Sequence, residues 1–337
     1  MIKVQELRKV YRQPIKKEGL KGVLLHYFKP KYVDKIAVDE INFEINEGES
    51  VAYLGKNGAG KSTTIKILTG ILQPTMGKVL IDNIDPQRNR KDYNKTIGVV
   101  FGQRTQLWWD LPISESFKLI KEIYQIDDRT YEHNLTIFSE LLDLNEFLHL
   151  SARKISLGQR MRADIAAALL HNPKILYLDE PTIGLDIVAK EKIRKFLRFI
   201  NKEFKTTILL TTHDMGDIEE LCDRLILIDS GKILYDGDLE SVIKKYARLK
   251  KIQIRVENIS KYEVLNGEFC NLGATLEALS EKEISVSFDY LEISASEVIS
   301  LVMNYMTILD LKIEESGIEF ILKQVYEGNL ILEEGGE

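Results

Sequence analysis

A glycine-rich segment near residue 60 combines residue types that can bind phosphate. The segment comprises Gly55, Lys56, Asn57, Gly58, Ala59, Gly60, Lys61 and Ser62, and it fits the pattern G-x-x-x-x-G-K-[ST]. Glycines let the backbone wrap around an anion with its N–H groups pointing inward, and the positive N-terminal end of a following helix adds to the attraction. Lys61 can then reach the β- and γ-phosphates of a nucleotide, and the Ser62 hydroxyl can bind Mg²⁺. The segment therefore predicts a phosphate site, or P-loop.

Two carboxylates follow an apolar run further along the chain. The run 175–178 ends at Asp179 and Glu180. A carboxylate at the C-terminal end of a parallel strand lies beside the P-loop in such a sheet. Asp179 suits a Mg²⁺ ligand, and Glu180 suits a group that orients an attacking water or takes its proton. Paired acidic residues after an apolar run are also typical of a helix cap, but the P-loop upstream favours the metal and water roles.

The elements that must position these residues alternate along the chain. Short apolar runs without polar alternation predict buried parallel strands at 50–54, 96–101, 174–179 and 206–212. Helical patterns fall between them, at 61–72, 113–124, 131–142, 161–171 and 188–204. Residues 224–228 and 232–235 flank Asp229-Ser230-Gly231 and predict a hairpin. This alternation indicates an α/β fold with a mainly parallel sheet.

The pattern changes near residue 240. Beyond it, the sequence predicts a helix, strands at 252–256, 283–288 and 308–313, and a second helix at 296–306. We therefore expect a first domain over 1–240 and a small α+β accessory domain over 241–337, with a role as a dimer brace, regulator or ligand sensor.

Composition limits the function classes. The chain has 337 residues and a net charge of −6, so it lacks the basic field of a nucleic-acid-binding protein. Its two cysteines, Cys222 and Cys270, form no disulfide framework and indicate a reducing compartment. The N-terminus does not resemble a signal peptide, and no run approaches the ~20 apolar residues that span a bilayer. Any action on a membrane is therefore expected to need a partner.

Four further motifs accompany the P-loop and the Asp179-Glu180 pair, and together they carry a family resemblance. In chain order they are Gln103 after an apolar strand, Ser156-Leu157-Gly158-Gln159, Gly184-Leu185-Asp186, and Thr211-Thr212-His213-Asp214. The set resembles the ABC ATPases (P-loop NTPase cassettes) over about residues 1–240. The resemblance implies a RecA-like core with an antiparallel β subdomain and an α-helical subdomain at about 103–172.

The resemblance also implies roles for these residues. ATP and Mg²⁺ would be the ligands, held by the P-loop and Thr63. Gln103 would contact Mg²⁺ or water, and His213 would sense the γ-phosphate and help hold Glu180. In this family two copies, identical or different, face head to tail. Ser156, Gly158, Gln159 and Asp186 of one copy would then complete the other copy's ATP site. Leu157 replaces the glycine usual in this motif, either as harmless variation or with an effect on contact with the γ-phosphate.

An aromatic ring upstream of the P-loop usually stacks on adenine in this family. Tyr11 is the predicted residue and Tyr32 is the rival, with core packing as the alternative for either. Residues 14–36 form an insertion that either faces a membrane partner or packs on its own domain. Trp108 and Trp109 are candidates for contact with that partner, and burial in the core is the alternative.

The insertion, the Ser-Leu-Gly-Gln motif and the C-terminal domain are similar to the daunorubicin- and viologen-type exporter ATPases. This similarity implies separate transmembrane permease subunits of the ABC-2 type and a place at the cytoplasmic face of the membrane. An importer ATPase and a soluble ABC ATPase without a transport role are the alternatives.

Overall fold

The computed structural model describes residues 1–14, 32–102, 104–246, 249–314, 317–328 and 330–332. The chain forms two compact units, Met1–Gly237 and Asp238–Glu337. Within the described ranges, no helix combines the length and the apolar character needed to cross a bilayer.

A six-stranded sheet forms the centre of the first unit. Its spatial order is β5 (Ile97–Phe101), β6 (Ile175–Asp179), β7 (Thr207–Thr211), β3 (Ser50–Gly55), β8 (Arg224–Asp229) and β9 (Lys232–Asp238). Neighbours from β5 to β8 pair in parallel, and all residues of β3 and β7 are buried. Burial on both faces explains why these strands read as continuous apolar runs in the sequence. Ser230 and Gly231 connect β8 to β9 with positive φ angles, as a two-residue hairpin turn requires.

A three-stranded antiparallel sheet lies beside the central sheet. Its order is β2 (Tyr32–Ile45), β1 (Ile2–Pro14) and β4 (Met76–Ile81). The β1–β2 ladder runs from Ile2 opposite Ile45 to Pro14 opposite Tyr32. This corrects the predicted insertion, since Pro14 and residues 32–36 are parts of two paired strands. Residues 15–31, the rest of that insertion, lie outside the described residues.

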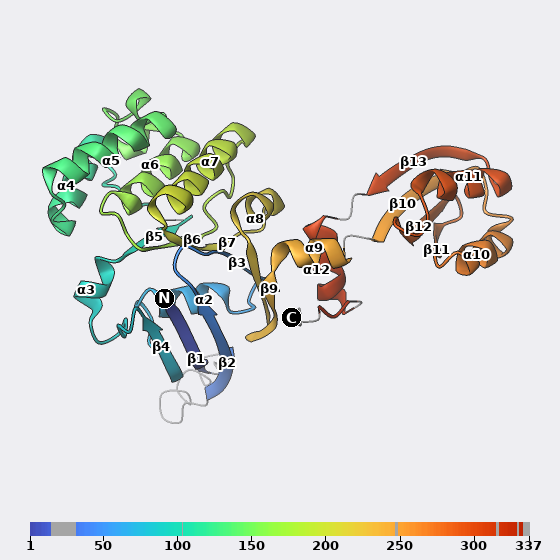
Figure 1. Cartoon of the computed structure of the whole chain (residues 1–337), viewed down its shortest axis with the longest axis horizontal. Coiled ribbons are helices and arrows are strands. Elements are labelled where there is room, and N and C mark those ends of the chain that lie inside the picture. The colour runs from blue at the N-terminus through green and yellow to red at the C-terminus, as the bar shows by residue number, and fades with distance from the viewer. Residues whose placement is uncertain (15–31, 103, 247–248, 315–316, 329, 333–337) are drawn as a thin grey trace, which may run out of the picture. The chain divides into compact units, whose positions relative to one another are not determined.

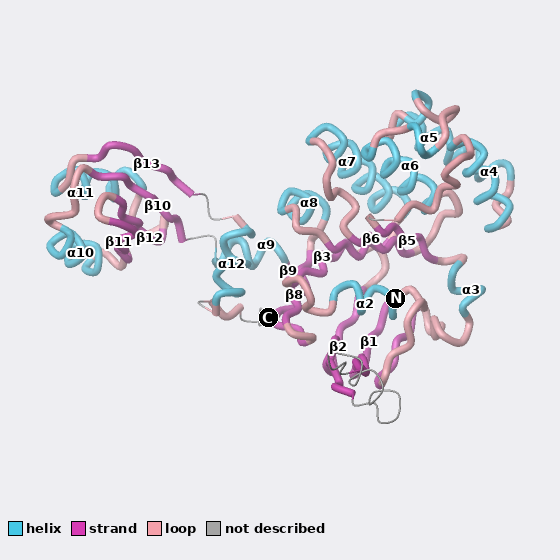
Figure 2. The backbone as a smooth tube through the Cα atoms, turned by 180° about the vertical axis from the view of Figure 1, so that it is seen from behind, coloured by secondary structure: helices cyan, strands magenta, loops and turns pink. Residues whose placement is uncertain are grey.

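Helices cover both faces of the central sheet. They are α2 (Lys61–Leu68), α3 (Arg90–Asn94), α4 (Ile113–Tyr124), α5 (Asp128–Leu141), α6 (Leu157–Leu169), α7 (Ile187–Phe204) and α8 (Met215–Leu221). Figures 1 and 2 show α2 on the side of the three-stranded sheet, and α5, α6 and α7 on the opposite side. The P-loop helix α2 and the Ser156 helix α6 therefore lie on different faces of one sheet.

Two helix boundaries differ from the sequence prediction by four residues. The predicted helix 61–72 ends at Leu68, because Gly70 adopts a φ of 71° and ends the helix before Pro74. The predicted helix 161–171 begins earlier, at Leu157, because Ser156 directly before it serves as the N-cap.

The second unit has its own apolar core. Its antiparallel sheet has the order β11 (Thr275–Ser280), β12 (Glu283–Asp289), β10 (Leu249–Val256) and β13 (Ile308–Glu314). The other elements are α9 (Leu239–Tyr246), α10 (Tyr262–Asn271), α11 (Ala295–Tyr305) and α12 (Ile318–Glu327). Alternate residues of β10 and β12, such as Ile254 and Ile284, pack with Phe269 of α10 and Val298 of α11. The helices α10 and α12 and the strand β11 were not predicted from the sequence.

Candidate nucleotide site

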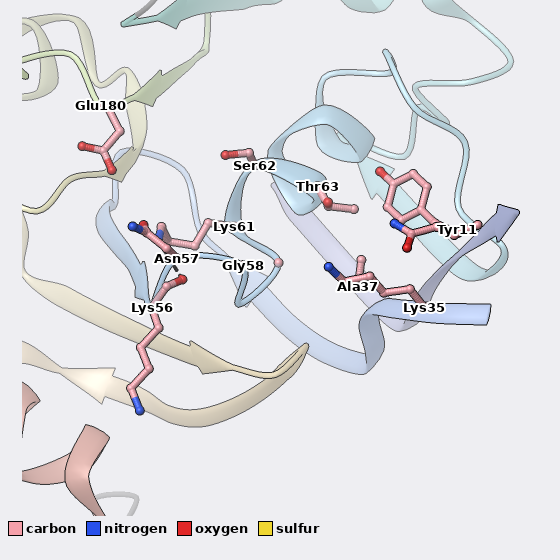
Figure 3. A pocket seen from close by; sticks show the side chains of 12 residues that line it. Tyr11, Lys35, Ala37, Lys56, Asn57, Gly58, Lys61, Ser62, Thr63 and Glu180 are labelled. Carbon is pink, nitrogen blue, oxygen red and sulfur yellow. Dashed lines mark hydrogen bonds between the residues drawn. The ribbon is translucent and has the colours of Figure 1, made fainter. Parts of the chain in front are cut away.

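A cavity of about 440 Å³ surrounds the P-loop (Figure 3). Its wall includes residues 56–58 and 60–63 of the loop and of the start of α2. Tyr11 from β1 and Lys35 from β2 stand at one end of the cavity, and Glu180 stands at the other. The predicted P-loop residues therefore share one cavity with a carboxylate and an aromatic ring.

The backbone of the loop has the shape that phosphate binding requires. Gly58 has a φ of 84°, and an added Cβ there would meet nothing within 4 Å. Gly60 has a φ of 114°, and an added Cβ would lie 2.4 Å from the carbonyl oxygen of Ala37. Positive φ angles let successive N–H groups converge on an anion, and α2 starts at the next residue, Lys61. A nucleotide phosphate fits this loop because the space beside Gly58 is open.

Lys61 supplies a positive charge inside the loop. Its side chain is buried, and Nζ donates hydrogen bonds to the carbonyl oxygens of Gly55 at 2.5 Å and Lys56 at 3.2 Å. Burial lowers the pKa of the Lys61 ammonium, against the opposing effects of Glu180 and Asp179. Phosphate oxygens can take over from the two carbonyl oxygens without Lys61 leaving the loop.

Asp179, Glu180 and His213 meet at the C-terminal ends of β6 and β7. The Thr211 hydroxyl donates to Asp179 Oδ1 at 2.6 Å, and the Glu180 N–H donates to the Thr211 carbonyl at 2.9 Å. Glu180 has a φ of 57°, a left-handed conformation uncommon for a non-glycine residue. Its Oε1 lies 3.1 Å from His213 Nε2. Burial raises the pKa of Glu180, against the lowering effects of His213 and Lys61.

A second cavity of about 330 Å³ joins the serine of the P-loop to this carboxylate pair. Ser62, Asp179 and Glu180 line it together with Gly102 at the end of β5. A hydroxyl and a carboxylate facing one space are ligands that Mg²⁺ accepts. Gln103, the third predicted metal ligand, lies outside the described residues.

The Ser156 motif forms the start of α6. The Gln159 N–H donates to Ser156 Oγ at 3.1 Å, and the Ser156 N–H donates to Gln159 Oε1 at 2.9 Å. These reciprocal hydrogen bonds make a capping box. An added Cβ at Gly158 would come within 3.2 Å of the Ala189 Cβ on α7. Close approach of two helices therefore explains the glycine at this position.

Asp186 caps the neighbouring helix α7, where its Oδ1 accepts the Ala189 N–H at 2.9 Å. Leu157 Cδ2 would lie 3.3 Å from a Cβ added at Gly184, so Leu157 sits against the loop that leads to Asp186. The residues lining the P-loop cavity do not include Ser156, Gly158 or Asp186. Within the described part of one chain, the two predicted halves of an ATP site remain separate.

The structure separates the two aromatic candidates for adenine. Tyr11 is half-buried and lines the P-loop cavity. Tyr32 is 52% exposed and is not among the residues lining that cavity. Neither ring is buried in the core, so core packing, the alternative considered from the sequence, accounts for neither tyrosine.

The two tryptophans lie at the surface rather than in the core. Trp108 is 38% exposed and Trp109 is 50% exposed. The Trp109 ring lies 5.4 Å from the guanidinium carbon of Arg160 on α6. Burial in the core, the alternative considered from sequence, is therefore wrong.

A buried carboxylate beside His213 was not predicted from the sequence. Asp217 on α8 is fully buried, and its Oδ2 accepts the hydroxyls of Thr212, at 3.0 Å, and of Thr182. Its Oδ1 accepts Arg194 Nε from α7 at 2.6 Å. Arg194 also donates to Asp214 at 2.7 Å. This network ties the residues on both sides of His213 to α7. The only sequence signal was an acidic residue one helical turn after His213.

A second missed carboxylate anchors the segment after Gln103. Asp164, on the buried side of α6, accepts the Thr105 hydroxyl and the Gln106 N–H, both at 2.9 Å. Burial raises its pKa to about 6, although these hydrogen bonds oppose the shift. A lone acidic residue in the otherwise apolar run 163–170 was the available signal.

Comparison with known proteins places this arrangement in a family. A profile described as "ABC transporter" matches residues 38–183. The chain is 33% identical over 206 residues to the ABC transporter ATP-binding protein NatA of Bacillus subtilis, covering 61% of this chain and 83% of NatA. It is 34% identical over 243 residues to the energy-coupling factor transporter ATP-binding protein EcfA2 of Clostridium perfringens, covering 70% and 85%.

A solved structure agrees with these relatives. The dimeric post-hydrolysis state of the ATP-binding cassette MJ0796, bound to ADP and Pi, superposes with a TM-score of 0.59 at 29% identity. The match covers 71% of this chain and 99% of that one. The chain belongs to the ABC transporter ATP-binding family. It is the ATPase subunit of an ABC transporter, and the predicted cassette fold is confirmed.

Proposed function

We propose that this chain hydrolyses ATP at composite sites formed with a second cassette and thereby powers export through separate permease chains at the cytoplasmic face of the membrane. The observation that carries the proposal is the separation of two half-sites. The P-loop helix α2 lies on one face of the central sheet, and the Ser156-capped helix α6 lies on the other (Figure 1). One chain presents both halves but cannot close them on one nucleotide.

The P-loop half binds and orients ATP. The backbone from Gly55 to Thr63 surrounds the phosphates, and Lys61 exchanges its carbonyl partners for phosphate oxygens. Tyr11 stacks on the adenine, since it is the ring at the far end of the same cavity. Ser62, Asp179 and Gln103 would hold Mg²⁺, which would neutralise charge on the phosphates.

Glu180 orients the attacking water and accepts its proton. A partly buried carboxylate with a raised pKa is a better base near neutral pH than a fully exposed one. His213, 3.1 Å from Glu180, holds this carboxylate and contacts the γ-phosphate. The arrangement is that of a water-positioning pair rather than of a covalent nucleophile.

The second half-site comes from the partner cassette, identical or different. Ser156, Gly158 and Gln159 would meet the γ-phosphate through the N-terminus of α6, and Asp186 would approach from the start of α7. Exposed apolar residues surround these helix starts, namely Leu157, Ile183, Ile187 and Val188. Such a patch suits a surface that a second cassette covers when ATP is bound.

A relative and two exposed tryptophans support export through a permease. The relatives include the bacitracin transport ATP-binding protein BcrA of Bacillus licheniformis, which is 31% identical over 230 residues. The exposed Trp108 and Trp109 are the proposed contacts with an ABC-2 type permease. The unit from Asp238 onward would act as an accessory domain.

Import is the second candidate, because the 34% identity to the energy-coupling factor protein EcfA2 is as high as the 33% identity to NatA. The chain should be purified with its membrane partner and assayed for compounds that stimulate ATP turnover. Stimulation without a solute-binding protein supports export, and a strict need for one supports import.

Glu180→Gln tests the catalytic assignment. The variant should retain Mg-ATP binding and lose about 10²–10⁴-fold in turnover, because the amide cannot take the proton. It should also elute as a dimer with Mg-ATP on size-exclusion chromatography. Glu191→Gln is the matched control, since this exposed carboxylate on α7 contacts only Lys195 among the ion pairs described. Wild-type turnover in Glu180→Gln would remove Glu180 from the mechanism.

A further inference from the structure

Strand β13 is an open edge of the sheet in the second unit. It pairs with β10 on one side and has no strand on the other among the described residues. Three apolar side chains along it are exposed: Leu309 at 57%, Leu311 at 39% and Ile313 at 43%. Open edges with apolar side chains are templates for pairing with another strand.

The positions of these residues show which face they extend. Leu311 lies opposite Ile254 of β10, and Ile313 lies opposite Ile252. Cross-strand partners point to the same face of a sheet, and both isoleucines belong to the core under α10 and α11. The apolar face therefore continues to the edge of the sheet and remains exposed there.

The sequence of β13 is complementary to itself in the antiparallel direction. Consider a second copy of the strand aligned so that Leu311 faces Leu311. Asp310 then lies opposite Lys312 of the second copy, whereas Leu309 falls at the register shift between the Arg255–Asp310 and Val256–Ile308 pairs and takes no part in the regular ladder. The Leu311 pair falls on one face and the two Asp310–Lys312 pairs on the other, and both kinds of pair stabilise antiparallel strands. Arg255 of β10, 3.6 Å from Asp310, adds a second cation beside that carboxylate.

Neighbouring registers and the other sheet edge lack this complementarity. Centring the pair on Asp310 or on Lys312 places like charges directly opposite each other, which destabilises the pairing. A register shifted by one residue would place Leu311 opposite Asp310 or Lys312 of the second copy. Each apolar side chain would then face a charged one. Strand β11, at the opposite edge, carries Glu277 and no basic residue, so it cannot form this kind of pair with itself.

We propose that β13 pairs antiparallel with β13 of a second copy of this chain, so that two four-stranded sheets join across a two-fold axis. The interface is isologous, and every contact occurs twice. It uses no residue of the nucleotide site, so it forms without ATP. The second unit thereby couples two chains whether or not nucleotide is bound, which favours a homodimer over a pair of different cassettes.

Charge reversal tests the proposal on the full chain without nucleotide. Sedimentation velocity over a concentration series should show a monomer–dimer equilibrium for the wild type. Asp310→Lys or Lys312→Asp alone should raise the dissociation constant about tenfold or more, because each introduces two like-charge pairs. The double variant, Asp310→Lys with Lys312→Asp, should recover most of the affinity. A monomeric wild type, or single variants that dimerise like it, would overturn the proposal.

Cross-linking gives a second test that does not depend on weakening the fold. Leu311→Cys, in a Cys270→Ser background, places two thiols opposite each other on the axis, within reach of a disulfide. Oxidation should give a covalent dimer that reductant reverses. Leu279→Cys on β11 is the control, since Leu279 is also exposed but lies at the other edge. Equal cross-linking of both variants, or of neither, would contradict pairing through β13.

Discussion

Replacing the carboxylate of Asp217 should destabilise the first unit by an amount that its contacts allow us to estimate. Asp217→Ala leaves the buried hydroxyls of Thr182 and Thr212 without this acceptor and removes one partner of Arg194. Each buried hydroxyl left without a partner costs about 1–3 kcal/mol, whereas Arg194 retains its hydrogen bond to Asp214. The expected loss is therefore about 4 kcal/mol. Asp217→Asn keeps one oxygen acceptor and should lose about 1–2 kcal/mol.

Tryptophan fluorescence during urea unfolding is a suitable assay. Both tryptophans of the chain, Trp108 and Trp109, belong to the first unit, so the signal does not report on the second. Glu220→Gln is the matched control, because Glu220 also contacts Arg194, at 3.2 Å, but is exposed. Exposed ion pairs contribute about 0–1 kcal/mol. If Asp217→Ala and Glu220→Gln unfold at the same urea concentration, the network around Arg194 does not hold the His213 region.

Three further substitutions test other parts of the molecule. Gly102→Ala puts a Cβ 2.1 Å from the carbonyl oxygen of Glu180, so kcat should fall at least about tenfold with nucleotide affinity retained, measured by turnover and binding. Tyr11→Ala should weaken ATP binding in titrations about fivefold or more, and Tyr32→Ala should not. Burial lowers the pKa of His171 from 6.5 to about 4 in the folded chain. As the pH falls below 6.5, His171 is therefore protonated in the unfolded chain before it is protonated in the folded chain, and the folded state loses stability. His171→Gln should therefore reduce the stability loss between pH 7 and pH 5 by about 2 kcal/mol in urea titrations; an unchanged loss would contradict the shift.

The central strands and the P-loop were accessible from sequence because their signals are local. A strand buried on both faces reads as an apolar run, and β6 falls inside the predicted range 174–179. The P-loop pattern fixes residue types at four of eight successive positions, and the structure places them at the turn from β3 into α2. Each signal depends only on neighbours in the chain.

The missed features depend on residues far apart in the sequence. Asp217 gains its contacts from Thr182 and Arg194, which belong to other segments, so no local pattern marks it. In the edge strand β11, the alternation of polar and apolar residues lasts only from Thr275 to Ala278, and Leu276 is the one buried residue of the strand. The hydrogen bonds that hold Asp164 also depend on tertiary packing.

The capping box at the start of α6 has a consequence for how two cassettes meet. Ser156 Oγ already accepts one N–H, and Gln159 Oε1 accepts another, so the first turn of the helix is rigid before any nucleotide arrives. As the first two residues of α6, Leu157 and Gly158 have N–H groups without an acceptor inside the helix. A preorganised pair of donors loses little conformational entropy on docking. The strength of ATP-driven closure is then set mainly by how the two protein surfaces fit around the triphosphate, and not by ordering of this segment.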